Sequence, residues 1–406
     1  MFILAYDFPT NWFVADRGLQ DGAVASAQGF VPAVLVLAGL FAVAQLAKSP
    51  EVFIWIATLE PLLPAFVLLA LSSTLWSASP ALTLRFSLPL VVIVVFGYWL
   101  VATFRLEQIL STLLAVLAVG TVINYALIFG LPQFGQSTIG WSGVLTDKNT
   151  FGRLSAFSAL HFAIAYRAFP HLRALWLILW VASVGLVIGS ESATSLTGLV
   201  GVHVVLVVAQ VFRARKTLYG AVALSLVGGG AVGLFIATAN LGFITNLLGK
   251  DITLTGRTVL WELSLKEAMN RPLLGHGWAA FWQGFLSPAR PVIDQNSWIP
   301  PHSHNALIDY FLVLGIVGTV LAFSFFVRFV VRSTRAVRYR PGILGLWPLS
   351  FASFAILFSI TEFGVISRSL FFLFTVVLSS VAALERSAGT HSPSNQASPR
   401  RHQPSS

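Results

Sequence analysis

The sequence predicts an all-α polytopic membrane protein with about eleven transmembrane helices, in a range of roughly ten to twelve. Of its 406 residues, 56% are hydrophobic and only 10% are charged, and the mean hydropathy is +0.81. A soluble protein carries about 25% charged residues. The apolar residues also come in long blocks, each of the roughly 17–25 residues that a membrane-spanning helix needs. The alternating segments of about ten residues that build membrane β-barrels are not the pattern here.

The apolar blocks divide the chain into five regions. We expect an N-terminal segment (1–28), a first set of helices (29–238), one large loop (239–305), a second set of helices (306–385) and a disordered tail rich in serine, proline, arginine and glutamine (386–406). The chain has no cysteine, which excludes disulfides and thiolate metal sites. The candidate spans are 29–47, 53–76, 86–104, 108–130, 151–168, 174–190, 194–212, 218–238, 306–327, 343–361 and 369–385. The span 53–76 contains Glu60-Pro61 and Pro64 and is therefore expected to kink or to be partly re-entrant.

The distribution of basic residues predicts the orientation of the helices. Fifteen of them fall on one side and five in the opposite short connections. By the positive-inside rule the first side is cytoplasmic, which places the C-terminus inside and the loop 239–305 outside. The net charge of +10 is mostly this orientation pattern, so we do not expect a nucleic-acid partner. The fifteen are Lys48, Arg105, Arg167, Arg173, Arg213, Arg215, Lys216, Arg328, Arg332, Arg335, Arg338, Arg340, Arg386, Arg400 and Arg401.

Two short polar segments on the outer side are candidate binding regions. Lys148, Asn149 and Arg153 lie where the span 151–168 begins, and the N-terminus of a helix favours an anion there. The alternative is a helix cap with side chains anchored at the membrane interface. Glu191, in the hydroxyl-rich turn between two spans, favours a capping role over a catalytic one.

The large loop contains a predicted interfacial helix that begins near Thr255, its candidate N-cap, and stops before Pro272. Its apolar face is expected to hold Trp261, Leu265 and Ala268. Arg257, in the first turn, is the best candidate to hold a phosphate, because a guanidinium pairs bidentately with one. The alternative is a contact with a lipid headgroup.

His302, His304 and Asn305 stand where this loop meets the span 306–327. Imidazole can transfer protons near neutral pH, so the pair suggests acid–base chemistry as well as interfacial hydrogen bonding. A zinc site needs three or four close ligands, and only His276 and scattered carboxylates are at hand, so we expect no metal.

These residues also form a motif pattern. His304-Asn305, nine residues, Gly315, two residues and Gly318 resemble the signature of the O-antigen ligase and polymerase superfamily. Four further stretches resemble motifs of that family in its order, and the chain looks most like the exopolysaccharide-production polymerases of the succinoglycan type. They are Trp76-Ser77-Ala78-Ser79-Pro80, Asp147-Lys148-Asn149-x-x-Gly152, Thr255-Gly256-Arg257-Thr258-x-x-Trp261 and Arg271-Pro272-Leu273-Leu274-Gly275-His276-Gly277.

The resemblance implies a GT-C-like membrane glycosyltransferase of the bacterial inner membrane, acting on its outer face without a metal or other cofactor. The implied donor is an oligosaccharide on undecaprenyl diphosphate, and a chain-length regulator is a further potential partner. His304 would be the catalytic base and Arg257 the diphosphate clamp, and attack by the acceptor would invert the anomeric centre. The substrate-binding residues would be Lys148, Asn149, Arg153, Glu191, Trp261, His302 and Asn305.

One departure from the family pattern bears on the reaction. Ligases tend to carry an arginine in a Ser-x-Ser-Arg turn, and here Ser190-Glu191-Ser192 is followed by Ala193. The polymerase is therefore the preferred interpretation. A ligase that transfers lipid-linked glycan to lipid A core or protein is the first alternative. A transporter or transport accessory is the second, and it would need ionisable residues at mid-membrane depth, for which Glu60 and His203 are the candidates.

Overall fold

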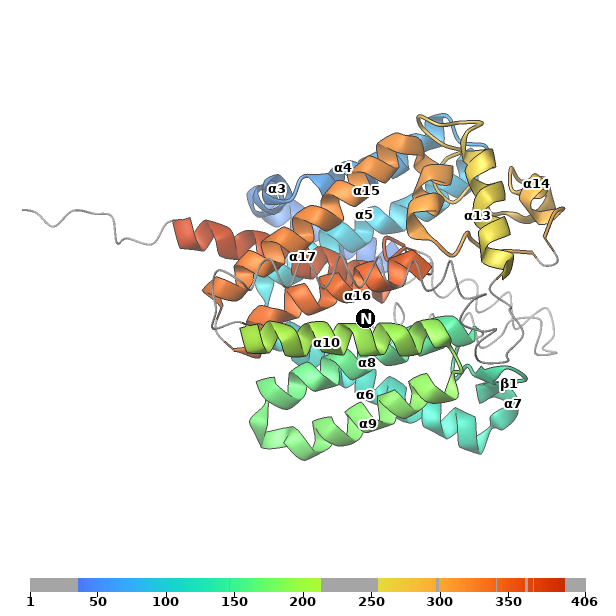
Figure 1. Cartoon of the computed structure of the whole chain (residues 1–406). Helices are drawn as coiled ribbons and strands as arrows, with labels where there is room; N and C mark the ends of the chain where they lie inside the picture. The colour runs from blue at the N-terminus through green and yellow to red at the C-terminus, as the bar shows by residue number, and fades with distance from the viewer. Residues whose placement is uncertain are drawn as a thin grey trace, which may run out of the picture.

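The computed structural model describes residues 36–212 and 255–390, apart from 146, 297–298, 341, 362–363 and 368. Most helices run along one direction, and α13, α14 and the small β1–β2 hairpin lie at one end of the bundle (Figure 1). The elements are the helix Val36–Lys48, α3 (Pro50–Leu59), α4 (Leu62–Ser72), η3 (Ser73–Leu75), α5 (Pro80–Thr103), α6 (Leu106–Gly130), α7 (Pro132–Gly135), β1 (Gln136–Ser137), β2 (Gly140–Trp141), α8 (Lys148–Ala168), η4 (Pro170–Leu172), α9 (Arg173–Gly189), α10 (Ala193–Phe212), α13 (Thr255–Ala268), η5 (Gly284–Leu286), α14 (Arg290–Ile293), α15 (Ala306–Tyr339), η6 (Ile343–Leu346), α16 (Trp347–Thr361) and α17 (Leu370–Thr390).

Six helices among the described residues are long and apolar enough to cross a membrane. The number becomes seven if the bent pair Val36–Lys48 and Pro50–Leu59 counts as one span, and Leu62–Leu75 and Leu370–Leu384 are shorter apolar helices. The helical, polytopic membrane class is thus confirmed. The count of eleven and the GT-C-like arrangement stay predictions, and the predicted span 218–238 lies outside the described residues.

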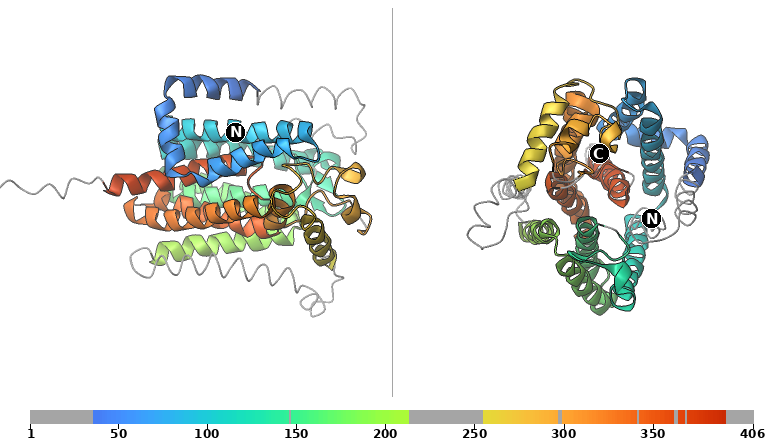
Figure 2. Two further views of the ribbon diagram at one scale, coloured as in Figure 1. Left: turned by 90° about the horizontal axis from the view of Figure 1, so that it is seen from above. Right: turned by 90° about the vertical axis from the view of Figure 1, so that its right-hand side faces the viewer.

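The predicted span 53–76 breaks at Glu60-Pro61, where a kink was expected, into α3 and α4. Pro61 lacks an N–H and disfavours helical backbone in the residue before it, and Glu60 has φ −127° and ψ 76°. The axis of α3 also turns by 98° from the preceding helix, and it crosses the end of the bundle in the view of Figure 2. The Glu60-Pro61 break therefore separates a crosswise helix from one that runs with the bundle.

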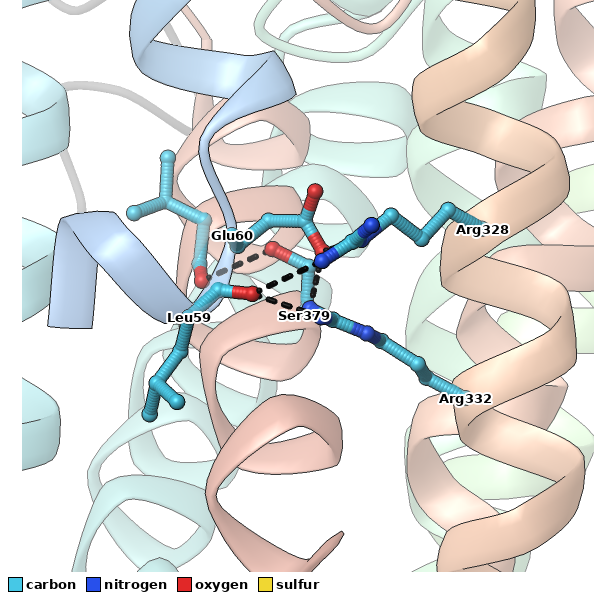
Figure 3. Close-up of polar contacts among 6 residues, drawn as sticks. Leu59, Glu60, Arg328, Arg332 and Ser379 are labelled. Atoms are coloured by element: carbon cyan, nitrogen blue, oxygen red, sulfur yellow. Dashed lines mark hydrogen bonds and ion pairs between the residues drawn. The ribbon is translucent and has the colours of Figure 1, made fainter. Parts of the chain in front are cut away.

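The helix α15 is longer than the predicted span 306–327, since it continues to Tyr339. Beyond its non-helical Gly315, residues 316–339 alone extend about 36 Å at 1.5 Å per residue, more than a hydrocarbon core of about 30 Å. A run of arginines follows the predicted span. Two of them, Arg328 and Arg332, pair with the Glu60 carboxylate and donate to the Leu59 carbonyl (Figure 3). This buried network joins the α3–α4 break to the far part of α15.

The centre of the bundle is an aromatic layer between α8, α16 and α17. Phe157 of α8 packs its ring against Phe354 and Phe371. His161, one turn further along, accepts a 2.9 Å hydrogen bond from the indole N–H of Trp347 at its Nε2 atom. All five side chains are buried. Helices that are apolar on all sides suit such an inner position, and the outer helices pack against them.

Candidate functional site

His302 and His304 lie side by side immediately before α15. Their ring centroids are 4.1 Å apart, and the backbone N–H of His304 donates to Nδ1 of His302 at 3.0 Å. His304 has a φ of 55°, a left-handed conformation that is uncommon outside glycine. Both side chains are half-buried. Asn305 then caps α15, since its side-chain oxygen accepts from the N–H groups of Leu307 and Ile308.

Ser303, between the two histidines, is held by hydrogen bonds of its N–H, its carbonyl and its hydroxyl. Its N–H donates to Asp309 Oδ1 at 3.0 Å, and its carbonyl accepts the indole N–H of Trp261 at 2.8 Å. Its hydroxyl donates to the carbonyl of Asn305 at 2.8 Å. Trp282 donates its own indole N–H to the same Asp309 oxygen at 2.9 Å. Residues with strained backbone persist only where the surroundings hold them, and these bonds hold the histidine segment.

A break in α15 connects this segment to the loop before it. Gly315 has φ 65° and ψ −166° inside the helix, and a Cβ there would lie 2.2 Å from the carbonyl oxygen of Leu273. The Ile316 N–H, released by the break, donates to the carbonyl of Pro272 at 2.8 Å. Gly275, also at positive φ, allows its turn to approach the α15 backbone closely. Gly315 and Gly275, one glycine from each of two predicted motifs, are therefore explained by one contact between backbones.

The same turn is joined to α15 and to the stretch 76–80. The N–H groups of His276 and Gly277 donate to the carbonyls of Leu312 and Val313, each at 2.9 Å. The His276 carbonyl accepts the N–H of Ala78 at 2.8 Å. Burial lowers the pKa of the His276 imidazole, which favours its neutral form. Three stretches far apart in sequence thus form one structure behind the two histidines.

The helix α13 places Trp261 in contact with this structure. Arg257 lies in the first turn of α13, four positions before Trp261 and so about one helical turn away. Its side chain is outside the described part of the structure, and its meeting with His304 remains a prediction. Leu265, on the expected apolar face, is exposed, and the interfacial position of α13 stays a prediction. Burial instead follows Leu260, Trp261, Ser264 and Ala268, since α13 packs on α15.

Lys148, Asn149 and Glu191 come together in a second cluster, at the start of α8 and the α9–α10 turn. The N-terminus of α8 is capped by Asp147, whose carboxylate accepts the Thr150 N–H at 2.6 Å. The Lys148 ammonium donates to the carbonyls of Ile139 at 2.9 Å and Glu191 at 3.5 Å. These contacts fit the structural alternative, and a role in substrate binding stays a prediction.

Arg153 and the carbonyl of Asn149 extend this second cluster toward other helices. The Asn149 carbonyl accepts the Ser195 hydroxyl at 3.4 Å. The Arg153 guanidinium lies 4.9 Å from the ring centroid of Phe371, in the first turn of α17. Phe371 follows the segment whose Ser367 lines the cleft beside the histidines. Arg153 is thus linked to the cleft beside the histidines through the start of α17.

A cleft of about 300 Å³ opens beside the histidine segment. Its walls include Trp278, Trp282, Gln283 and Asp309. Asp309 is 1% exposed, and its Oδ2 atom has no hydrogen-bond partner among the described residues. Asp309 was not among the site residues predicted from the sequence. An acidic residue in the first turn of an apolar helix, five positions after His304, is the feature that would have identified it. In the described part of the chain no three histidine, aspartate or glutamate side chains gather as a metal site would require.

Comparison with known proteins supports the resemblance seen in the motifs. Residues 177–323 match the family model described as O-Antigen ligase. The resemblance to the O-antigen ligase and polymerase superfamily is confirmed. A relative in Rhizobium meliloti (strain 1021), described as exopolysaccharide production protein ExoQ, is 29% identical over 272 residues, which are 63% of this chain. The alignment spans 61% of that relative's length. The apolar helices and this match together indicate a multi-pass bacterial membrane protein.

Proposed function

We propose that the protein is a membrane glycosyltransferase that polymerises repeat units carried on undecaprenyl diphosphate, on the outer face of the inner membrane. The observation that carries the proposal is the fixed His302–His304 segment. Three motif stretches of the family converge behind it through backbone hydrogen bonds, and a cleft with a few polar groups among apolar ones opens beside it. The description of the relative in Rhizobium meliloti as an exopolysaccharide production protein agrees with such a product.

In the proposed reaction, a sugar hydroxyl of the acceptor attacks the anomeric carbon of the donor, and the bond from that carbon to the phosphate oxygen breaks. His304 takes the hydroxyl proton, as a general base within reach of the acceptor does. The lipid diphosphate leaves with the electron pair of the broken bond, and Arg257 would stabilise its charge. Direct displacement inverts the anomeric centre and uses no metal. A chain-length regulator would be a separate partner.

The test is His304→Ala, with His171→Ala as the matched control, because His171 is an exposed histidine in the η4 turn. Both variants are quantified in the membrane fraction, and polymer length is read by gel electrophoresis of the product. We expect His304→Ala to make no long chains while its membrane level is normal, and His171→Ala to resemble the wild type. Long-chain polymer from the His304→Ala protein would refute the assignment of the base.

A ligase is the second candidate, because the matching family model carries that description. Product analysis separates the two reactions. A polymerase yields free or lipid-linked long chains, whereas a ligase yields glycan attached to lipid A core or to protein.

The transport alternative has less support from the structure. Glu60 is paired with Arg328 and Arg332, and His203 accepts the indole N–H of Trp180 at 3.0 Å. Both ionisable residues that would favour transport thus make structural contacts. Solute uptake by vesicles that contain the purified protein, without any glycan product, would favour transport.

A further inference from the structure

We infer that the cleft beside the histidine segment is a carbohydrate subsite that holds one sugar unit of the glycan through Asp309. The inference rests on the proposed function and adds a binding position to it. The cleft combines two tryptophan side chains, Trp278 and Trp282, with an amide at Gln283 and a carboxylate at Asp309. Flat apolar surfaces beside a few fixed polar groups are typical of small-molecule sites, and a sugar ring presents both apolar C–H faces and hydroxyls.

Asp309 is built as a hydrogen-bond acceptor for a ligand. Its Oδ1 atom accepts two N–H bonds, from Ser303 at 3.0 Å and from Trp282 at 2.9 Å. These bonds fix the orientation of the carboxylate, and Oδ2 is left without a partner in the described part of the protein. A buried polar atom without a partner is costly, so a ligand donor there is strongly favoured. A sugar hydroxyl is such a donor.

The volume and the position of the cleft agree with a sugar unit. About 300 Å³ is at the lower limit of small-molecule sites, which suits a monosaccharide unit better than a whole repeat or a lipid chain. Asp309 also bonds to Ser303, the residue between the two histidines. A sugar held by Asp309 would therefore be adjacent to His304, where an acceptor hydroxyl has to be.

The test is sugar binding by the purified full chain in lipid nanodiscs, measured by saturation-transfer NMR with D-glucose, D-galactose and their disaccharides. Asp309→Asn keeps an oxygen for the Ser303 and Trp282 bonds and places an amide N–H₂ in the cleft instead of an acceptor. We expect the affinity for a binding sugar to fall at least tenfold, since hydrogen bonds to charged groups are among the stronger ones. Asp294→Asn is the matched control, because Asp294 is an exposed aspartate paired with Arg290 at 3.4 Å.

A second variant covers the case in which Asp309→Asn does not fold. Gln283→Ala removes another polar side chain of the cleft, whose exposed amide bonds to the Ala279 carbonyl, and it should weaken binding several-fold. Equal affinity in the wild type and in the folded variants would overturn the subsite, as would no sugar binding by the wild type.

The readouts separate the subsite from the proposed function. Sugar binding that depends on Asp309, together with an absence of polymer from the wild type, would retain the subsite and reject the polymerase. Polymer synthesis with sugar binding unaffected by Asp309→Asn would retain the polymerase and reject the subsite. Displacement of the sugar by phospholipid alone would show that the cleft holds a lipid and would also overturn the subsite.

Discussion

Replacing Glu60 with glutamine should destabilise the bundle from the end opposite the histidines. Glu60 is 1% exposed, and its carboxylate faces the guanidinium groups of Arg328 and Arg332. Breaking a buried ion pair costs about 3–5 kcal/mol, because the remaining charge has no counter-charge. The glutamine oxygen still accepts one N–H, which offsets about 1 kcal/mol. The expected loss in the free energy of unfolding is therefore about 2–4 kcal/mol.

Arg328 gives an internal comparison. Its side chain is 40% exposed whereas that of Arg332 is 8% exposed. Solvent screens the pair of Arg328 with Glu60, so Arg328→Met should lower the free energy of unfolding by about 1 kcal/mol or less. Arg332→Met should lower it several times more. The assay is unfolding of the purified protein in mixed micelles by increasing dodecyl sulfate. The double variant Glu60→Gln/Arg332→Met measures the coupling between the two residues.

Glu51→Gln is the matched control, since Glu51 is an exposed glutamate in the first turn of the same helix α3. Its effect should stay within about 0.5 kcal/mol. The reasoning is refuted if Glu60→Gln unfolds at the same denaturant concentration as Glu51→Gln, or if the changes at Glu60 and Arg332 simply add.

Two further predictions concern the backbone contact behind the histidines. Gly315→Ala should lower the free energy of unfolding by at least about 1–3 kcal/mol from the positive φ alone, and the Leu273 carbonyl would also have to move. The control in the same micelle unfolding assay is Gly130→Ala, because a Cβ at Gly130 meets nothing within 4 Å. Equal stability of the two variants would contradict the contact. The pKa of His276 is lowered by burial, so the unfolded chain binds a proton more readily than the folded one. Stability is then full above an unfolded pKa of about 6.5 and falls at lower pH. His276→Gln should flatten the unfolding profile between about pH 7.5 and 5, and an unchanged profile would argue against this effect.

The sequence predicted the membrane class and selected the histidine segment, because composition and local motifs carry that information. It did not predict which stretches meet. The contact between the turn 272–277 and α15 is made largely by main-chain atoms, and such bonds leave no pattern of side-chain types. The motif spacing located Gly315 but could not name the carbonyl of Leu273 as the reason for it.

Two details were not predicted, for the same physical reason. Leu265 was placed on an apolar face expected at the membrane interface, whereas the face of α13 that packs within the protein includes polar Ser264. The helix α15 continues to Tyr339, whereas the predicted span ended at 327, before a run of arginines. Their partner, Glu60, is distant in the sequence and sits at a break that was expected as a kink. Hydropathy describes one residue at a time, and tertiary partners decide these cases.

At Gly315 the main-chain contact must be kept, whereas the side chains around it are less constrained. Because carbonyls and N–H groups make it, most side chains of the turn 272–277 can change without loss of the contact. The outer wall of the cleft, in contrast, comes from Trp282 and Gln283, which precede the short η5 helix. Exchange of the segment from 283 to 296 between related chains, with Trp282 kept for its bond to Asp309, should therefore transfer sugar preference while the histidines keep their geometry, which offers a practical route to polymers of new composition.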